Sequence, residues 1–149
     1  MIISPICLIH SKVKAKSDVL RLLESQLSCG FPSPCDGYLE TMPSLNELLI
    51  KHPSASFLAR AQGESMIERG ILDGSLLIID RAEKVKHGCT IIASIAGELT
   101  VKIWDEKRQL LQPANRNMQP ISVSEGLEAI CEGVVTFCIT PQHNYTFAC

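Results

Sequence analysis

The amino-acid sequence predicts a mainly β protein, a compact antiparallel β domain that carries a short, partly helical N-terminal arm. From about residue 54 onward, short runs of β-branched residues alternate with glycine and charged residues. Turn signals separate these runs at Asp73-Gly74, His87-Gly88 and residues 96–98. The chain has 149 residues and 46% hydrophobic content, which suits one soluble globular core and leaves no room for a second full domain.

The N-terminal arm is expected to contain a short helix that ends at a linker. Ser17 or Asp18 can cap this helix, and its apolar positions recur at near-helical spacing as far as Leu27. Gly30 is placed to end the helix, as a C-terminal glycine usually does. Because two prolines follow closely, residues 29–37 are predicted to form an extended or turning linker between the arm and the body.

A second helix and six strands complete the predicted elements. Ser44 is an N-cap candidate with Glu47 three residues later, in the register of a capping box, and Pro53 ends the apolar stretch that follows. The expected strands are, in chain order, Ser75–Asp80, Thr90–Ile95, Leu99–Trp104, Gln109–Gln112, Ile121–Val123 and Gly133–Thr140.

Charge and cysteine content argue against several classes of protein. The net charge is −2 and no long basic stretch exists, so a protein held to DNA mainly by phosphate contacts is not indicated. The seven cysteines include no CxxC pair and no histidine at ligand spacing, which predicts neither a zinc site nor a disulfide framework. We therefore expect reduced thiols, no metal and no cofactor.

The N-terminus does not resemble a secretory signal. Its apolar run, Ile2 to Ile9, is interrupted by Pro5, follows no positive charge and precedes lysines, which reverses the usual order. No apolar stretch approaches the roughly 20 residues that a bilayer-spanning helix needs. The expectation is a cytoplasmic protein without a membrane partner.

Ser65 is the candidate nucleophile. It lies two residues after Gly63, in a turn that precedes an apolar stretch with helical character. A serine there can hold its hydroxyl outward while nearby backbone N–H groups converge on one point, as an oxyanion hole requires. Taken alone, the motif also fits a serine that merely caps or turns the chain, which is the more common role.

Lys102 is the candidate general base, since none of the four histidines is well placed to serve Ser65. Strand alternation puts Lys102 between Thr100 and Trp104 on one face of the predicted strand. Desolvation there would lower the pKa of the amine and allow it to accept a serine proton. The alternative is an amphipathic strand whose lysine extends to solvent, and spacing alone favours that interpretation.

Six collinear blocks of sequence carry a family resemblance. The chain resembles UmuD and its plasmid-borne relatives, within the LexA-like peptidase family, at CGFPSP (29–34), LNELLIKHPSA (45–55), GESM (63–66), GILDGSLLIID (70–80), GELTVKIW (97–104) and PANRNMQPI (113–121). The resemblance implies a β peptidase domain of the LexA and signal-peptidase type. It covers nearly the whole chain, so it is far more specific than one serine motif.

The resemblance implies self-cleavage by a serine–lysine dyad after contact with a RecA filament on single-stranded DNA. Ser65 matches the nucleophile and Lys102 the general base. The scissile bond matches Cys29-Gly30, and the backbone N–H groups of Ser65 and Met66 match the oxyanion hole. A small residue before the bond and a glycine after it would let the backbone approach the nucleophile closely.

The resemblance also implies a domain division and partners. Residues 1–29 would be an arm removed by self-cleavage, 30–44 a linker, 45–141 the peptidase domain and 142–149 a tail. Twenty-nine residues are too few for the DNA-binding domain that LexA carries, so direct sequence-specific DNA binding is not expected. The trimmed chain would be a homodimer that joins a UmuC-like, Y-family polymerase subunit in the SOS response, for error-prone translesion synthesis.

Two other functions are compatible with the same sequence. One is a dimeric polymerase-binding module that keeps the fold and does not cleave. The other is a processing peptidase that acts on other chains, like the signal peptidases, although these carry a membrane anchor.

Overall fold

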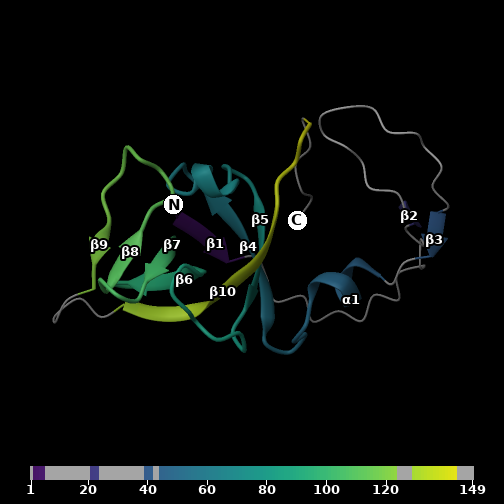
Figure 1. The fold of residues 1–149 in the computed structure, drawn as a ribbon, viewed down its shortest axis with the longest axis horizontal. Helices are drawn as coiled ribbons and strands as arrows, with labels where there is room; N and C mark the ends of the chain where they lie inside the picture. The colour runs from purple at the N-terminus through teal and green to yellow at the C-terminus, as the bar shows by residue number, and fades with distance from the viewer. Residues whose placement is uncertain (1, 6–20, 24–38, 42–43, 124–128, 144–149) are drawn as a thin grey trace. The chain divides into compact units, whose positions relative to one another are not determined.

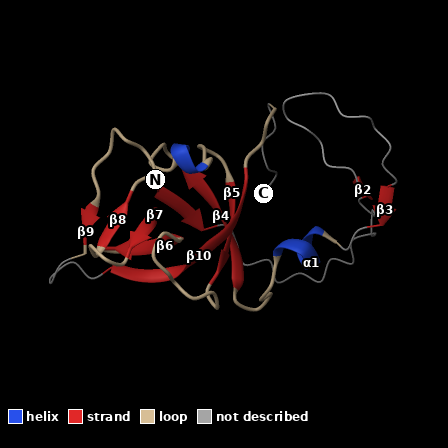
Figure 2. Ribbon diagram, in the orientation of Figure 1, coloured by secondary structure: helices blue, strands red, loops and turns tan. Residues whose placement is uncertain are grey.

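The computed structural model describes residues 2–5, 21–23, 39–41, 44–123 and 129–143 (Figure 1). The chain divides into two compact units. Residues 2–5, 52–123 and 129–143 are the described part of the larger unit, and residues 21–23, 39–41 and 44–51 are that of the smaller one. Most of the described elements are strands, which confirms the prediction of a mainly β protein (Figure 2).

The larger unit contains an eight-stranded sheet in which every pairing is antiparallel. The strand order is β1-β4-β5-β10-β6-β7-β8-β9, and β1 pairs with β7 as well as with β4, so the sheet curls back on itself. The strands are β1 (Ile2–Pro5), β4 (Ser56–Gln62), β5 (Leu76–Asp80), β6 (Thr90–Ile95), β7 (Glu98–Asp105), β8 (Leu110–Gln112), β9 (Ile121–Ser122) and β10 (Ala129–Ile139).

The six predicted strands are all present, with ends that differ from the prediction by no more than a few residues. The predicted Thr90–Ile95 coincides with β6, whereas β10 begins four residues before the predicted Gly133. Two strands of the same sheet, β1 and β4, were not predicted. Both lie beside the elements that carry the candidate site, because Ile2 of β1 pairs with Gln62 of β4 and with Thr100 of β7.

The smaller unit confirms one prediction and overturns another. Helix α1 (Leu45–Leu49) begins with the expected capping box, in which Ser44 and Glu47 bond each other's backbone N–H groups. The helix predicted for the arm is wrong at Arg21–Leu23, which forms strand β2 and pairs with β3 (Leu39–Thr41). The partner strand supplies the hydrogen bonds that a helix would otherwise make within itself.

Two clusters of buried apolar side chains form the core of the larger unit. One contains Met66 and Val101, both completely buried, together with side chains from β4, β5 and β6. The other contains Leu111 and Ile91 and has Trp104 packed against it. In the residues that the structure describes, no helix has the length and apolar character needed to cross a membrane.

Candidate active site

Ser65 lies in the turn that follows β4. Gly63 has a φ of 92°, a left-handed conformation that favours glycine, and its N–H donates to Asp73 Oδ1 at 2.6 Å. The chain then passes through Ser65 into a short 3₁₀ helix, η1 (Ile67–Arg69), which agrees with the helical character expected after the serine. Ser65 is only 2% exposed. The turn therefore holds the hydroxyl within the protein and away from bulk water.

Lys102 lies on β7, where it pairs with Ile91 of β6, and its side chain is 6% exposed. Its Nζ lies 3.1 Å from the Ser65 Oγ. It also donates to the Thr100 Oγ1 at 2.9 Å and to the Val101 carbonyl at 3.0 Å. The structure thus brings the two candidate residues into direct contact, although they are 37 positions apart in the sequence.

The surroundings of Lys102 favour its neutral form. Burial lowers the pKa of the Lys102 ammonium below its ordinary value. The three hydrogen-bond partners of Nζ are two hydroxyls and a carbonyl, all uncharged, so no carboxylate among them offsets the loss of water. A lysine held in this way can release its proton near neutral pH more readily than one at the surface, and can then accept the proton of a serine.

Packing on the neighbouring residues holds the pair together. Met66 follows Ser65, and Val101 precedes Lys102. The side chains of Met66 and Val101 have no exposed surface, and both belong to the same core cluster. Burying side chains of this size contributes about 1.5–3 kcal/mol each. The hydrophobic core therefore fixes the backbone on both sides of the contact between Ser65 and Lys102.

The environment that the sequence predicted for Lys102 is confirmed in one respect. Thr100 lies on the same face of β7 and bonds the amine, as strand alternation indicated. Trp104 packs against the second core cluster, which includes Leu111 and also Ile91, the residue that pairs with Lys102. The desolvation of Lys102 therefore comes from its burial in the sheet, with a hydroxyl and a carbonyl as its polar neighbours on the strand.

Two histidines form pairs with carboxylates, but neither pair includes the serine. His52 Nδ1 lies 2.6 Å from Asp80 Oδ2, and His87 Nδ1 lies 3.4 Å from Asp105 Oδ1. The hydrogen-bond partner of the Ser65 hydroxyl is Lys102. Among the described residues, lysine is thus the base in reach of this serine, and a serine–histidine–aspartate arrangement does not form there.

The backbone N–H groups of Ser65 and Met66 have no hydrogen-bond acceptor in the part of the chain that the structure describes. Two donors nearby are satisfied, because Gly63 N–H bonds Asp73 and Glu68 N–H bonds the Ala114 carbonyl at 2.9 Å. Two unoccupied donors beside a serine hydroxyl are what a developing oxyanion would require.

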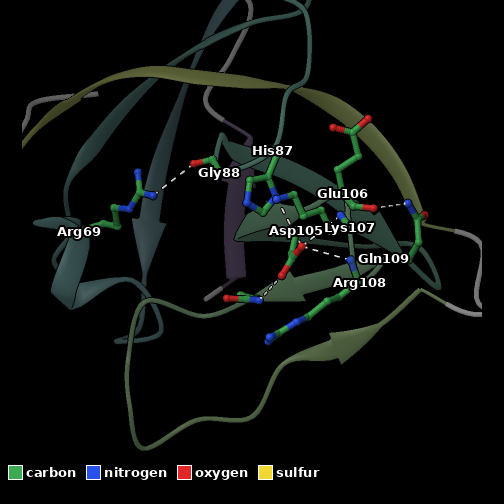
Figure 3. A network of polar contacts seen from close by, with 9 residues as sticks. Arg69, His87, Gly88, Asp105, Glu106, Lys107, Arg108 and Gln109 are labelled. Atoms are coloured by element: carbon green, nitrogen blue, oxygen red, sulfur yellow. Dashed lines mark hydrogen bonds and ion pairs between the residues drawn. The ribbon is translucent and has the colours of Figure 1, made fainter.

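A polar network at the end of β7 fixes the strand that carries Lys102 (Figure 3). The buried Asp105 carboxylate accepts from the backbone N–H groups of Lys107 and Arg108, at 3.1 and 3.2 Å, and from the Gln112 side chain at 2.7 Å. These bonds close the turn between β7 and β8, and His87 approaches the same carboxylate from a neighbouring loop.

A second part of this network joins the serine segment to the lysine strand. Arg69 of η1 donates to the Gly88 carbonyl at 3.2 Å, and Gly88 N–H donates to the Trp104 carbonyl at 2.8 Å. Figure 3 shows Arg69 pointing toward this loop. The sequence predicts only a turn at His87-Gly88, and nothing local in it indicates that the turn bridges these two elements.

The proposed cleavage site, Cys29-Gly30, lies outside the described residues. Among the described residues, no cluster of three metal-binding side chains occurs.

Comparisons with known proteins agree on one family. Residues 21–136 match the family model described as Peptidase S24-like. The chain is 43% identical over 129 residues to Protein ImpA of Salmonella typhimurium, which covers 83% of this chain and 85% of ImpA. It is 36% identical to Protein MucA of Escherichia coli, over 74% of this chain and 77% of MucA. It is also 37% identical to the LexA repressor of Psychromonas ingrahamii, over 82% of this chain and 61% of the repressor.

Proposed function

This chain belongs to the Peptidase S24-like family, and from that premise we propose that it is a serine peptidase in which Lys102 is the general base for Ser65. The single observation that carries the proposal is the 3.1 Å contact between the Ser65 hydroxyl and a buried lysine amine. Family membership supports peptidase chemistry, and the contact between these two side chains supports their roles as nucleophile and base. The substrate that we propose is the chain's own Cys29-Gly30 bond.

The first half of the reaction forms an acyl-enzyme. Neutral Lys102 takes the proton of the Ser65 hydroxyl as its oxygen attacks the Cys29 carbonyl carbon. The N–H groups of Ser65 and Met66 then stabilise the negative oxygen of the tetrahedral intermediate. When the bond to Gly30 breaks, the Lys102 ammonium gives its proton to the departing Gly30 nitrogen, which becomes the new N-terminus.

The second half releases the arm. Lys102, neutral again, removes a proton from a water molecule that attacks the acyl carbon, and Ser65 leaves with that proton. During each charged stage, the Thr100 hydroxyl and the Val101 carbonyl accept hydrogen bonds from the ammonium. The two acceptors hold the amine in place while it gains and loses a proton, so the reaction needs no further base.

Incubation of the purified chain at alkaline pH tests the proposal, because rising pH deprotonates Lys102. Intact mass measurement should detect a fragment that begins at Gly30, and its rate of formation should increase with pH up to a plateau. The Ser65→Ala chain, incubated in parallel, should stay whole. Equal fragment formation by the two chains, or a stable wild-type chain, would contradict self-cleavage by Ser65; the second result would favour a binding module that keeps only the fold.

We further propose that cleavage has a regulatory purpose in the SOS response. Contact with a RecA filament on single-stranded DNA would stimulate it, and the trimmed chain would act as a homodimer with a UmuC-like, Y-family polymerase subunit in the cytoplasm. The identity to ImpA and MucA supports this branch of the family. Loss of residues 1–29 would then convert the intact chain into the trimmed form that binds the polymerase subunit.

A further inference from the structure

Asn115 lies in the loop between β8 and β9 and bonds the turn that holds Ser65. Its side chain is largely buried, with 7% exposed. Its Nδ2 donates to the Glu64 carbonyl at 3.0 Å, while its Oδ1 accepts from the Asn117 N–H at 3.0 Å. The two ends of the amide are therefore used in different ways: one orders the loop itself, and the other reaches 51 positions back along the chain.

The bond to the Glu64 carbonyl also orients the Ser65 N–H. The carbonyl of one residue and the N–H of the next belong to the same planar peptide unit and point in opposite directions when the bond is trans. No cis peptide bond occurs in the described structure. A donor that fixes the Glu64 carbonyl thereby fixes the direction of the Ser65 N–H, which is one of the two unoccupied donors beside the Ser65 hydroxyl.

We infer that Asn115 is a positioning residue that aims the Ser65 N–H at the oxyanion of the reaction. The inference rests on the proposed function, since it assigns a purpose to the peptide unit before the nucleophile. Asn115 has no bond to Lys102, whose partners are Ser65, Thr100 and Val101. It therefore acts on charge stabilisation and leaves the base unchanged.

The same loop provides a matched control. Arg116 follows Asn115, and its Nε and backbone N–H bond the Glu68 carboxylate at 3.0 and 3.3 Å. This contact also joins the loop to the segment after Ser65, but it is exposed, with the arginine side chain 84% accessible. An exposed ion pair contributes about 0–1 kcal/mol. Because it does not touch the peptide unit before Ser65, its loss should leave the reaction nearly unaffected.

Self-cleavage at alkaline pH compares Asn115→Asp, Asn115→Ala and Arg116→Gln with the wild-type chain. Aspartate keeps the size and the acceptor to Asn117 but loses the donor to Glu64, and alanine loses both without adding charge. We expect both Asn115 variants to cleave on the order of 10 to 100 times more slowly, because one oxyanion donor is misaligned. Arg116→Gln should stay within about twofold of wild type. The pH midpoint of cleavage should not move in Asn115→Ala.

A folded Asn115→Ala chain that cleaves at the wild-type rate would overturn the inference, and so would a rate loss that follows a moved pH midpoint. A second readout does not depend on activity. The nitrogen-15 shift of the Ser65 amide responds to the hydrogen bond at the preceding carbonyl, so Asn115→Asp and Asn115→Ala should move it and Arg116→Gln should not. An unmoved Ser65 signal in either folded Asn115 variant would refute the positioning role, whether or not the wild-type chain cleaves. A wild-type chain that never cleaves would instead count against the proposed function.

Discussion

Replacing Lys102 by methionine is expected to abolish self-cleavage, with a rate at least about 10³-fold below wild type. The two members of a dyad act as a unit, so removing the base should cost nearly as much as removing the nucleophile. Methionine keeps an unbranched chain in the sheet but cannot accept a proton. Lys102→Arg is the complementary variant, because its guanidinium keeps the charge and stays protonated throughout the accessible pH range. Both rates are measured from fragment formation at alkaline pH.

The Lys102→Met chain should nevertheless fold at least as well as the wild type. A buried amine whose pKa is lowered binds fewer protons in the folded state than in the unfolded state. The wild-type free energy of unfolding should therefore rise with pH as Lys102 loses its proton, and be smallest below the folded-state pKa. Methionine removes this dependence. Urea unfolding at neutral and alkaline pH checks this, with Ser65→Ala as the uncleaved reference.

A Lys102→Met chain that still forms the fragment would contradict the assignment of the base. An active Lys102→Arg chain would contradict it as well, since a permanently charged side chain cannot take the serine proton. If the methionine variant fails to fold, its cleavage rate cannot be interpreted. Fragment formation by the Lys102→Arg and Ser65→Ala chains is then compared with that of the wild type.

Replacing Gly30 by valine is expected to reduce cleavage by on the order of 10²- to 10³-fold. The reacting carbonyl must come within about 3–3.5 Å of the Ser65 oxygen, and a displacement of about 1 Å can cost 100-fold. A β-branched side chain directly after the bond obstructs that approach and restricts the backbone, which glycine does not. The residual fragment, measured by intact mass, should still begin at residue 30.

Cys29→Ala is the matched control for this position. Alanine keeps a small residue before the bond and removes the thiol, so its cleavage rate should stay within a fewfold of wild type. If Gly30→Val were cleaved as fast as the wild-type chain at the same bond, close approach of the backbone would not be required. A fragment that begins elsewhere in both chains would refute Cys29-Gly30 as the substrate and leave the dyad itself in place.

Local sequence signals predicted the elements whose causes are local. The capping box of Ser44 and Glu47 predicts its hydrogen bonds from two residues three positions apart. Thr90–Ile95 is a run of β-branched and apolar residues between turn signals. The alternation along β7 placed Thr100 beside Lys102, where the structure has it. That Ser65 and Lys102 meet could not come from alternation, and it was the family resemblance that paired them.

The elements that were missed depend on partners distant in the chain. Strand β1 ends at Pro5, within an apolar run for which the sequence signals predict no strand, yet it pairs with β4 and β7. The residues of β4 include two alanines, Ala59 and Ala61, which do not favour strands and are buried in the core here. Strand β2 replaced a predicted helix because a partner strand outweighed local spacing.

The supports of the site are equally non-local. In the sequence, Asn115 is only one residue of the block 113–121 that carries the family resemblance, and nothing there gives it a role. Its contact with the Glu64 carbonyl depends on how the loop between β8 and β9 returns to the serine turn. No periodicity of residues near position 115 identifies that contact. Arg69 and Gly88, which link η1 to β7, were missed for the same reason.

The protonation state of Lys102 can be titrated directly, and the proposed chemistry requires this amine to be neutral while the protein is folded. The carbon-13 signal of its Cε can be followed with pH in the slowly cleaving Gly30→Val chain and assigned by its loss in Lys102→Met. We expect a midpoint below the ordinary lysine value of about 10.4, coincident with the midpoint of the wild-type cleavage rate. A Lys102 that titrates at the ordinary value, or a cleavage rate with a different midpoint, would contradict the proposed chemistry.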